Sequence, residues 1–465
     1  MDYKVNIGLE VHIELLTKNK MFCTCKSRFG DEENKNICPI CLGLPGSLPT
    51  PNKEAISLAI KTGIGTNCQI NNKILFDRKN YFYKDLPKGY QITQFYNPIC
   101  KNGYINLENK KINIREIHME EDAGKKGKNN NIDYNRAGIP LLELVTMPDF
   151  ENANEVIEFL NILKEILIFC NISDCKIQEG SMRVDINLSI RKENMPLGNR
   201  VEIKNVGSFK SIKRAIDFEI KRHINLLENG YNINIETRKF DEDNNVTIFM
   251  RNKETIQDYC YFKDPDIIPI NLSYEFIENI SNTLPILPNE KRKIYKEQYN
   301  LSKNNIDSIL SSPKTTKLFD DLIKINNCPK EISNLICGEL FKIINENKLC
   351  IEDIKFNTNY ISTLINLFLN SKISRDTYKN VFYEIIINNK NPIKFIEKNN
   401  LYLITDIKFI ENTIIQIIQQ NSNSINDYKN GKEKALKYLI GKCMKAFNGK
   451  CDNNIIKDIL LKYIN

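Results

Sequence analysis

The segment 115–145 carries the densest set of chemically active groups in this chain of 465 residues. Five carboxylates lie within eighteen residues beside His118: Glu116, Glu120, Glu121, Asp122 and Asp133. Glu143 follows in the apolar run 141–145, which predicts a buried strand. A buried carboxylate needs a partner, because an unpaired charge is costly away from water. Oxygen ligands of this kind suit Mg²⁺ with phosphate oxygens, and the alternative is a solvated acidic loop beside one structural ion pair.

Two further groups with possible chemistry stand near the start of the chain. Residues 5–12 alternate apolar with polar or small side chains, as a half-buried strand does. Glu10 and His12 therefore share one face of this strand. A carboxylate and an imidazole so placed could serve one metal or phosphate site, or they could form an ordinary surface pair.

Four cysteines have the spacing C-x-C-x12-C-x2-C: Cys23, Cys25, Cys38 and Cys41. Paired cysteines of this kind, with Gly and Pro beside the second pair, predict a zinc site. Four protein ligands would close the tetrahedron, so we expect zinc to stabilise the fold and not to catalyse a reaction. Four unrelated buried thiols are the alternative.

Three later stretches of the sequence carry basic and polar side chains that could act together with these groups. Residues 76–94 interleave basic, aromatic and amide groups, which could hold a nucleotide or could form a polar loop packed on aromatics. Residues 179–190 and 201–209 predict two strands, one with Arg183, Asp185 and Asn187 on a single face, the other with Glu202 and Lys204. Two such strands would make a polar floor, which a purely structural sheet rarely builds.

The remaining pattern is helical, and its composition is that of a globular protein. Helices are predicted at 54–65, 154–172 and 210–227, and from about 275 to the end the chain becomes helical throughout. The lysines near the end outnumber acidic residues, and Lys434, Lys437 and Lys445 fall on one side of a helix whose opposite stripe is apolar. Lysines without arginines suit phosphate contact, and the alternative is an ordinary solvated face.

Composition sets limits on partners and compartment. A net charge of +8 permits a nucleic-acid partner without demanding one. With no apolar leader and no run of about eighteen apolar residues, we expect a soluble protein without membrane partners, cytoplasmic (bacterial-type) or organellar. Fourteen cysteines without a secretion signal favour a reducing compartment.

Several long motifs, in order along nearly the whole chain, resemble those of the B subunit of the aspartyl/glutamyl-tRNA amidotransferases. They are 7–12, 38–46, 76–83, 133–143, 179–187, 202–205 and 428–450. The resemblance implies an α+β cradle domain of the glutamine synthetase type over 1–288, with a mixed or antiparallel sheet and a zinc-binding insertion near 23–41. A helical middle domain over 289–357 and a helical, tRNA-binding tail over 358–465 would follow.

The resemblance also implies a reaction. The B subunit would use ATP to phosphorylate the side-chain carboxylate of Glu or Asp esterified to tRNA(Gln) or tRNA(Asn), and ammonia would then displace the phosphate. The ammonia would come from an amidase, the A subunit, in a heterotrimer with a small C subunit. Magnesium and ATP would serve the chemistry, and zinc the structure.

The resemblance assigns roles to residues already singled out. Magnesium ligands would be Glu10, His12, Glu121 and Glu143, with Glu120 and Asp185 as further candidates. Lys79, Arg183 and Lys204 would bind phosphate, with Tyr81 as an aromatic neighbour, because phosphoryl transfer to a carboxylate brings two anions together. Lys434, Lys437 and Lys445 would contact tRNA.

Three positions depart from the family pattern, at Gly207, Phe240 and Cys260. A catalytically inactive tRNA-binding scaffold is the alternative function, and the presence of every acidic and histidine ligand disfavours it. A stand-alone ligase that uses free ammonia is disfavoured because the sequence has no amidase signature.

Overall fold

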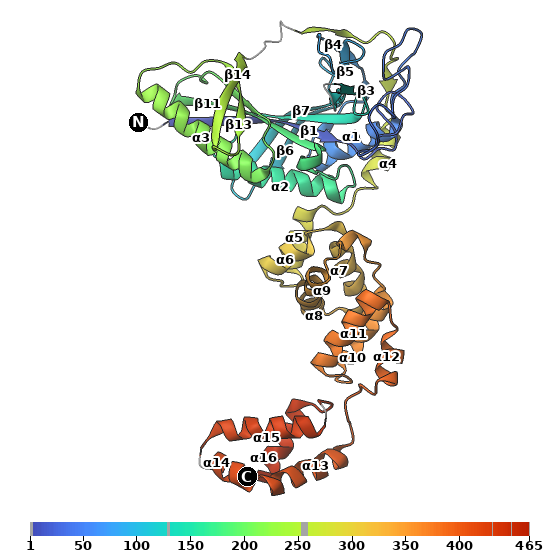
Figure 1. Cartoon of the computed structure of the whole chain (residues 1–465), viewed down its shortest axis with the longest axis vertical. Coiled ribbons are helices and arrows are strands. Elements are labelled where there is room, and N and C mark those ends of the chain that lie inside the picture. The colour runs from blue at the N-terminus through green and yellow to red at the C-terminus, as the bar shows by residue number, and fades with distance from the viewer. Residues whose placement is uncertain (1–2, 128–130, 253–258, 430, 448, 465) are drawn as a thin grey trace. The chain divides into compact units, whose positions relative to one another are not determined.

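The computed structural model describes residues 3–127, 131–252, 259–429, 431–447 and 449–464 (Figure 1). The chain divides into two compact units, Met1–Glu290 and Lys291–Asn465. The first unit is built on a large mixed sheet, and the second is helical (Figure 1). This outline agrees with the α+β class and the helical remainder that the sequence predicts.

The large sheet has nine strands in the order β14-β13-β12-β11-β1-β10-β7-β6-β2. Strands β12 and β13 pair in parallel, and the other neighbours pair antiparallel. The strands are β1 (Tyr3–Glu14), β2 (Gln69–Ile70), β6 (Cys100–Asn106), β7 (Lys111–Glu121), β10 (Pro140–Thr146), β11 (Met182–Lys192), β12 (Val201–Lys204), β13 (Glu236–Asp241) and β14 (Val246–Asn252).

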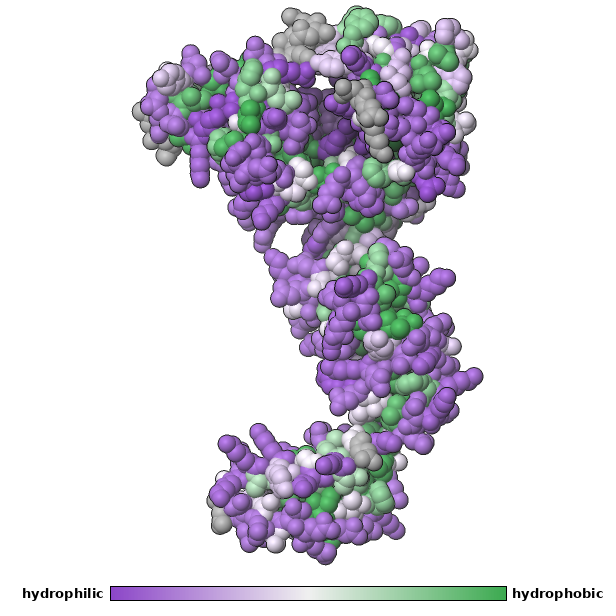
Figure 2. All heavy atoms as spheres, in the orientation of Figure 1, coloured by the Kyte–Doolittle hydropathy of each residue, from purple (hydrophilic) through white to green (hydrophobic). Residues whose placement is uncertain are grey.

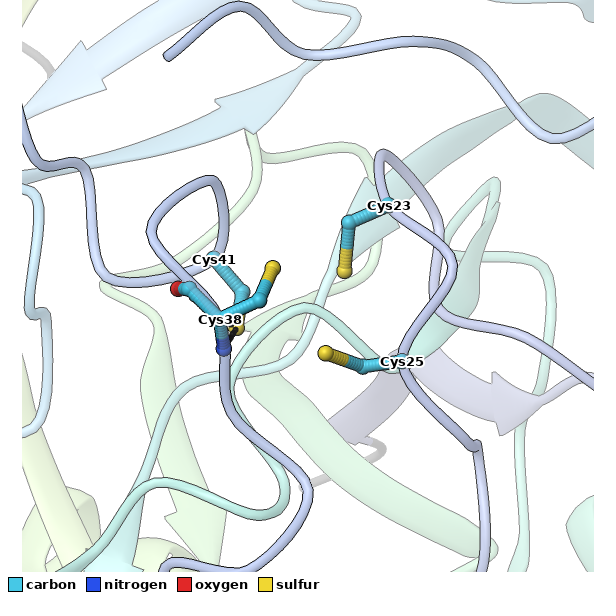
Figure 3. Close-up of side chains that lie close together, drawn as sticks. All are labelled: Cys23, Cys25, Cys38 and Cys41. Atoms are coloured by element: carbon cyan, nitrogen blue, oxygen red, sulfur yellow. Dashed lines mark hydrogen bonds between the residues drawn. The ribbon is translucent and has the colours of Figure 1, made fainter.

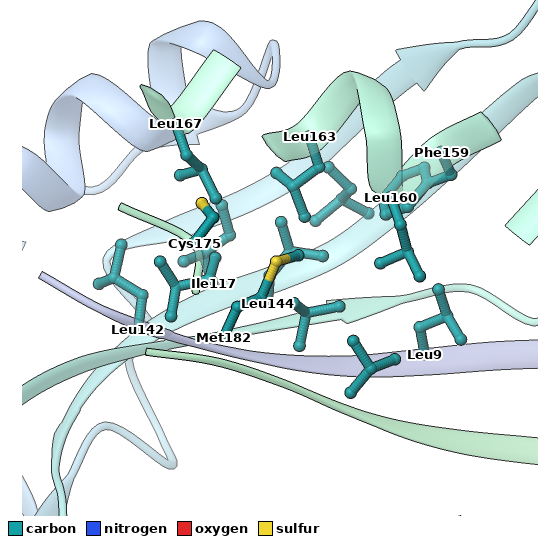
Figure 4. Packing of buried hydrophobic residues seen from close by; sticks show 14 of the residues in the cluster. Leu9, Ile117, Leu142, Leu144, Phe159, Leu160, Leu163, Leu167, Cys175 and Met182 are labelled. Atoms are coloured by element: carbon teal, nitrogen blue, oxygen red, sulfur yellow. The ribbon is translucent and has the colours of Figure 1, made fainter. Parts of the chain in front are cut away.

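One face of this sheet is apolar and covered by helices. Leu9, Ile117, Leu142, Leu144 and Met182 point toward α2, whose Phe159, Leu160, Leu163 and Leu167 complete the core (Figure 4). The helices of this unit are α1 (Lys53–Gly65), α2 (Ala153–Phe169), α3 (Phe209–Glu228) and α4 (Tyr274–Ser281). Helix α5 (Pro288–Glu297) includes the division between the two units at Glu290. Because strand side chains alternate, covering this face leaves the polar residues of the same strands on the other face.

The acidic stretch before residue 122 is the last part of strand β7, whereas the sequence suggested a loop there. A change of register between Val145 and Thr146 in its pairing with β10 explains the difference. Ile112 and Ile114 are buried before this irregularity, and Ile117 and Met119 after it, so simple alternation is broken once along the strand.

A smaller sheet lies beside the large one and contains both ends of the interleaved basic and aromatic stretch. Its order is β15-β4-β5, with β4 at Asp77–Asn80, β5 at Tyr90–Thr93 and β15 at Cys260–Lys263. The side chain of Gln94 accepts a hydrogen bond from the backbone N–H of Met119, which fixes this sheet next to the end of β7. Two short pairs complete the strands: β3 (Lys73–Ile74) with β16 (Ile270–Asn271), and β8 (Lys125–Lys126) with β9 (Ile132–Asp133).

The second unit contains two groups of helices. Helix α10 packs against α7, and α13 to α16 enclose a separate core that includes Ile410, Leu439 and Leu460. This packing joins α10 to the middle helices. The helices are α6 (Lys303–Ile309), α7 (Pro313–Asn326), α8 (Pro329–Asn334), α9 (Phe341–Glu346), α10 (Thr358–Leu369), α11 (Arg375–Asn388), α12 (Pro392–Lys398), α13 (Ile407–Gln420), α14 (Ser422–Lys429), α15 (Glu433–Ala446) and α16 (Asn453–Ile464).

Among the described residues, no helix has both the length and the apolar character needed to cross a membrane.

Candidate functional site

The polar face of the large sheet carries a row of ionisable side chains across four neighbouring strands. His12 on β1 lies opposite Glu143 on β10 and Arg183 on β11, and Glu143 in turn lies opposite His118 on β7. Directly opposed residues of antiparallel strands point to the same face. Figure 2 shows a hydrophilic hollow in the first unit on this side of the sheet, away from α2.

The first cluster on this face consists of His12, Glu120 and Glu143, whose ligand atoms all lie within 4.8 Å of one another. The His12 Nε2 atom is 3.4 Å from Glu120 Oε1 and 3.7 Å from Glu143 Oε2, and His118 Nε2 is 2.8 Å from the same Glu143 oxygen. Burial, followed by the charge of Glu143, raises the pKa of Glu120. Two buried carboxylates held this close favour a shared cation.

The second histidine of this row has an electrostatic role. Burial alone would lower the pKa of His118, but the Glu143 carboxylate outweighs it and raises this pKa to about 9. Burial alone would raise the pKa of Glu143, but His118 and His12 outweigh it and hold this pKa below its usual range. The His118 imidazole and the Glu143 carboxylate therefore each favour the charged form of the other.

The second cluster consists of Glu10, Asp185 and Glu202, from strands β1, β11 and β12. Asn187 donates a hydrogen bond of 2.9 Å to Glu10, and Thr237 donates one of 2.8 Å to Glu202. Lys204 Nζ is 2.8 Å from Asp185 and 3.6 Å from Glu202. Three carboxylates from three strands are the hard oxygen donors that Mg²⁺ prefers, so this set fits magnesium.

The structure separates the four residues that the sequence analysis grouped around one magnesium ion. Glu10 belongs to the second cluster, and Glu120 replaces Glu121 beside His12 and Glu143. The Glu121 carboxylate pairs with Lys88 and accepts the backbone N–H of Ile92. Because neighbouring residues of a strand point to opposite faces, only one of these two glutamates can face the cluster.

Three of the predicted phosphate-binding side chains surround the clusters. Arg183 Nη2 lies 3.0 Å from Asp122, which also pairs with Arg136. Lys204 lies within the second cluster. Lys79 extends from the small sheet over the rings of Tyr259 and Tyr81, with its Nζ 4.7 and 5.5 Å from the ring centres.

The four cysteines converge as the spacing predicts. Figure 3 shows Cys23 and Cys25 on one loop facing Cys38 and Cys41 on another, and their sulfur atoms lie within 4.8 Å of one another. Tetrahedral zinc with bonds of about 2.3 Å holds its sulfurs about 3.8 Å apart, so this set fits zinc after a small contraction.

The three lysines predicted to contact tRNA are exposed on helix α15, in the second unit. Leu439 and Cys443 on the opposite side of this helix are buried in the core that α13 to α16 enclose. Lys442 and Tyr438 are also exposed on this side of the helix, with the Lys442 Nζ 5.6 Å from the centre of the Tyr438 ring. Neither residue was singled out from the sequence.

The chain is similar to known proteins over nearly its whole length. Residues 5–278 match the GatB/GatE catalytic domain, and residues 317–464 match the GatB domain. The B subunit of the aspartyl/glutamyl-tRNA(Asn/Gln) amidotransferase from Lachnoclostridium phytofermentans is 44% identical over 98% of both chains. The protein of the same name from Clostridium novyi is 43% identical over 100% of both chains. The one from Caldicellulosiruptor saccharolyticus is 44% identical over 99% of this chain and 98% of its own length.

The chain belongs to the family of aspartyl/glutamyl-tRNA amidotransferase B subunits.

The positions that depart from the usual motifs of this family lie outside both clusters. Gly207 follows β12 and faces Glu242, and Phe240 is buried under the Arg214 guanidinium. Cys260 is exposed and lies opposite Asn80 in the small sheet. The side chains of both clusters that could bind a metal are present, and membership in this family does not favour an inactive scaffold.

Proposed function

We propose that this chain activates aminoacyl-tRNA for amidation. ATP phosphorylates the side-chain carboxylate of Glu on tRNA(Gln), of Asp on tRNA(Asn), or of both, and ammonia replaces the phosphate to give the amide. The observation that carries this proposal is the pair of acidic clusters side by side on one polar sheet face, flanked by Arg183 and Lys204. Phosphoryl transfer depends mainly on positioning and on neutralising charge, and this face provides both.

The chain's own side chains divide this work. Bound magnesium would neutralise the ATP phosphates and polarise the transferred phosphoryl group. His12, Glu120 and Glu143 would hold one ion, and Glu10, Asp185 and Glu202 a second. Arg183 and Lys204 would orient phosphate oxygens, and Lys79 with Tyr81 would approach from the small sheet.

The ammonia requires a partner chain. The two family matches account for residues 5–278 and 317–464, and neither is described as an amidase. We therefore propose a heterotrimer in which an amidase, the A subunit, releases ammonia from glutamine and a small C subunit completes the complex. The large sheet and its flanking small sheet would form a cradle of the glutamine synthetase type that receives the acceptor end of tRNA.

The overall proposal is tested by reconstituting the complex and supplying Glu-tRNA(Gln) and Asp-tRNA(Asn) separately, with ATP and glutamine. We expect ATP hydrolysis that depends on the mischarged tRNA, and formation of Gln-tRNA(Gln), Asn-tRNA(Asn) or both. A complex that binds both tRNAs but amidates neither would instead be a scaffold.

A zinc ion held by Cys23, Cys25, Cys38 and Cys41 gives a prediction of its own. Metal analysis of the full chain is expected to find about one zinc, because four thiolates close the tetrahedron around one ion. A Cys38→Ser/Cys41→Ser variant is expected to lose the metal and to unfold at a lower temperature. A wild-type chain that is fully stable without metal would contradict the assignment.

The tail gives a second prediction, because its lysines suit contact with phosphates. Removing the chain after about residue 400 is expected to raise the KM for aminoacyl-tRNA while kcat stays near that of the intact complex. Changing Lys434, Lys437 and Lys445 together to alanine is expected to flatten the plot of log binding constant against log salt by up to about 3 units, or about 0.9 for each phosphate that is no longer neutralised.

Two exposed lysines on other tail helices, Lys408 on α13 and Lys457 on α16, provide the matched control. The Lys408→Ala/Lys457→Ala variant loses two surface charges from helices that pack in the same core, and it leaves α15 unchanged. An unchanged salt dependence in the triple variant would mean that the α15 lysines are merely solvated.

A further inference from the structure

Lys20 is a buried lysine beside the cysteine cluster, and its side chain is 0% exposed. Its Nζ lies 3.8 Å from Cys41 Sγ and donates a hydrogen bond of 3.2 Å to the carbonyl oxygen of Tyr134. Among the described residues, no carboxylate oxygen lies close enough to Lys20 to form an ion pair, and nearby Glu121 is paired with Lys88. A buried ammonium without a counter-charge is strongly destabilising, so this position needs a negative partner.

The cysteine cluster becomes that partner when it binds a metal. Four thiolates around one divalent ion carry a net charge of −2, and a neutral thiol cluster carries none. We propose that Lys20 is the counter-charge of the metal-bound thiolates and strengthens metal binding by donating to Cys41 Sγ. This inference rests on the proposed zinc site and adds a residue outside the four ligands.

The same ammonium connects the metal to the turn that precedes strand β10. Its second acceptor, Tyr134, lies in the turn between Asp133 and Gly138, before the strand that carries Glu143. The segment between Cys25 and Cys38 forms two more hydrogen bonds with this turn. The Asn34 backbone N–H donates to the Asp133 side chain, and the Asn36 backbone N–H donates to the Asn135 side chain. Lys20 therefore acts as a positioning residue that connects the cysteine cluster to the turn before β10.

Lys20→Met tests this inference, because methionine keeps the apolar stem and removes the charge. In the full chain, competition with a chelator is expected to show zinc affinity lowered about 10- to 100-fold, the usual loss when an outer partner of a metal site is removed. Lys18→Met, at an exposed position two residues earlier, is expected to bind zinc as the wild-type chain does. Equal zinc affinity in the wild-type and Lys20→Met chains would overturn the inference.

Thermal unfolding separates a counter-charge from a merely structural role. With zinc loaded, Lys20→Met is expected to unfold at a lower temperature than wild type, because the thiolates lose their compensating cation. After zinc is stripped by chelator, this difference is expected to shrink or reverse, because the four sulfurs then no longer carry the net charge of −2 that Lys20 compensates. Destabilisation of both forms by the same amount would overturn the inference, whereas a wild-type chain without zinc would refute the zinc site itself.

Discussion

Replacing Glu143 with alanine is expected to abolish tRNA-dependent ATP hydrolysis and amide formation. Glu143 lies between His12 and His118 in the row across the sheet, and its carboxylate contacts both imidazoles. Without it, the first cluster loses one of two acidic ligands, and His118 loses the anion that sustains its charge. Removing an outer partner of a metal site costs 10–100-fold, so loss of a ligand is expected to lower kcat by more than about 100-fold.

The measurement is steady-state ATP hydrolysis by the reconstituted complex, with and without mischarged tRNA. Glutaminase activity of the amidase partner is expected to persist at its basal level, because that chemistry belongs to another chain. Binding of tRNA is expected to change little, since the tail lysines are untouched. A correctly folded Glu143→Ala complex that forms amide at a near wild-type rate would show that the site lies elsewhere.

His12→Ala is expected to give the same loss, for a related reason. The imidazole of His12 faces both Glu120 and Glu143, and it lies at the point where the first cluster meets Arg183 on the neighbouring strand. A variant that kept ATP hydrolysis while losing amide formation would place His12 in the second half-reaction instead.

Sequence periodicity was sufficient to predict strands β1, β10, β11 and β12, which carry much of the site. Alternation over residues 5–12 placed Glu10 and His12 on one face, and the structure confirms that Ile7, Leu9 and Val11 are buried on the other. The predicted helix at 54–65 is found at Lys53–Gly65, and the one at 210–227 at Phe209–Glu228. These predictions succeed because local alternation and helical spacing depend on the face that must be buried.

The grouping of the ligands could not be predicted in the same way. Glu10 and His12 share a face but join different clusters, because Glu10 lies opposite Asp185 and His12 lies opposite Glu143. Those neighbours are fixed by pairing between segments more than a hundred residues apart. Glu202 was noted as part of a polar floor, but its place beside Glu10 depends on the pairing of β11 with β12.

The small sheet escaped prediction for a similar reason. Strands β4 and β15 are short and lie about 180 residues apart in the sequence, with Asp77 opposite Lys263. Strand β4 has no apolar residue and β15 has only four residues, so neither shows the alternation of a half-buried strand. From the sequence alone, the aromatic residues around Lys79 were therefore compatible with a loop. The structure places Tyr259 beside Tyr81, and Lys79 lies over both rings.

The neighbouring residues Glu120 and Glu121 provide the sharpest test of the site, because the structure gives them different roles. Glu120 faces His12 at 3.4 Å, whereas Glu121 pairs with Lys88 beside the zinc loop. Glu120→Gln is expected to lower tRNA-dependent ATP hydrolysis by more than about 100-fold while the unfolding temperature changes little. Glu116→Gln is the matched control, since this residue lies on the same strand and pairs with exposed Arg115.

Glu121→Gln is expected to act on stability, because it leaves the Lys88 ammonium, 7% exposed, without its anion. Breaking a buried ion pair by removing one partner costs about 3–5 kcal/mol, which denaturant unfolding of the full chain would detect. If Glu120→Gln kept full ATP hydrolysis and Glu121→Gln abolished it in a stable chain, then Glu121 would be the ligand. The end of β7 would in that case have to shift by one residue relative to β10, because a one-residue shift exchanges the two faces of a strand.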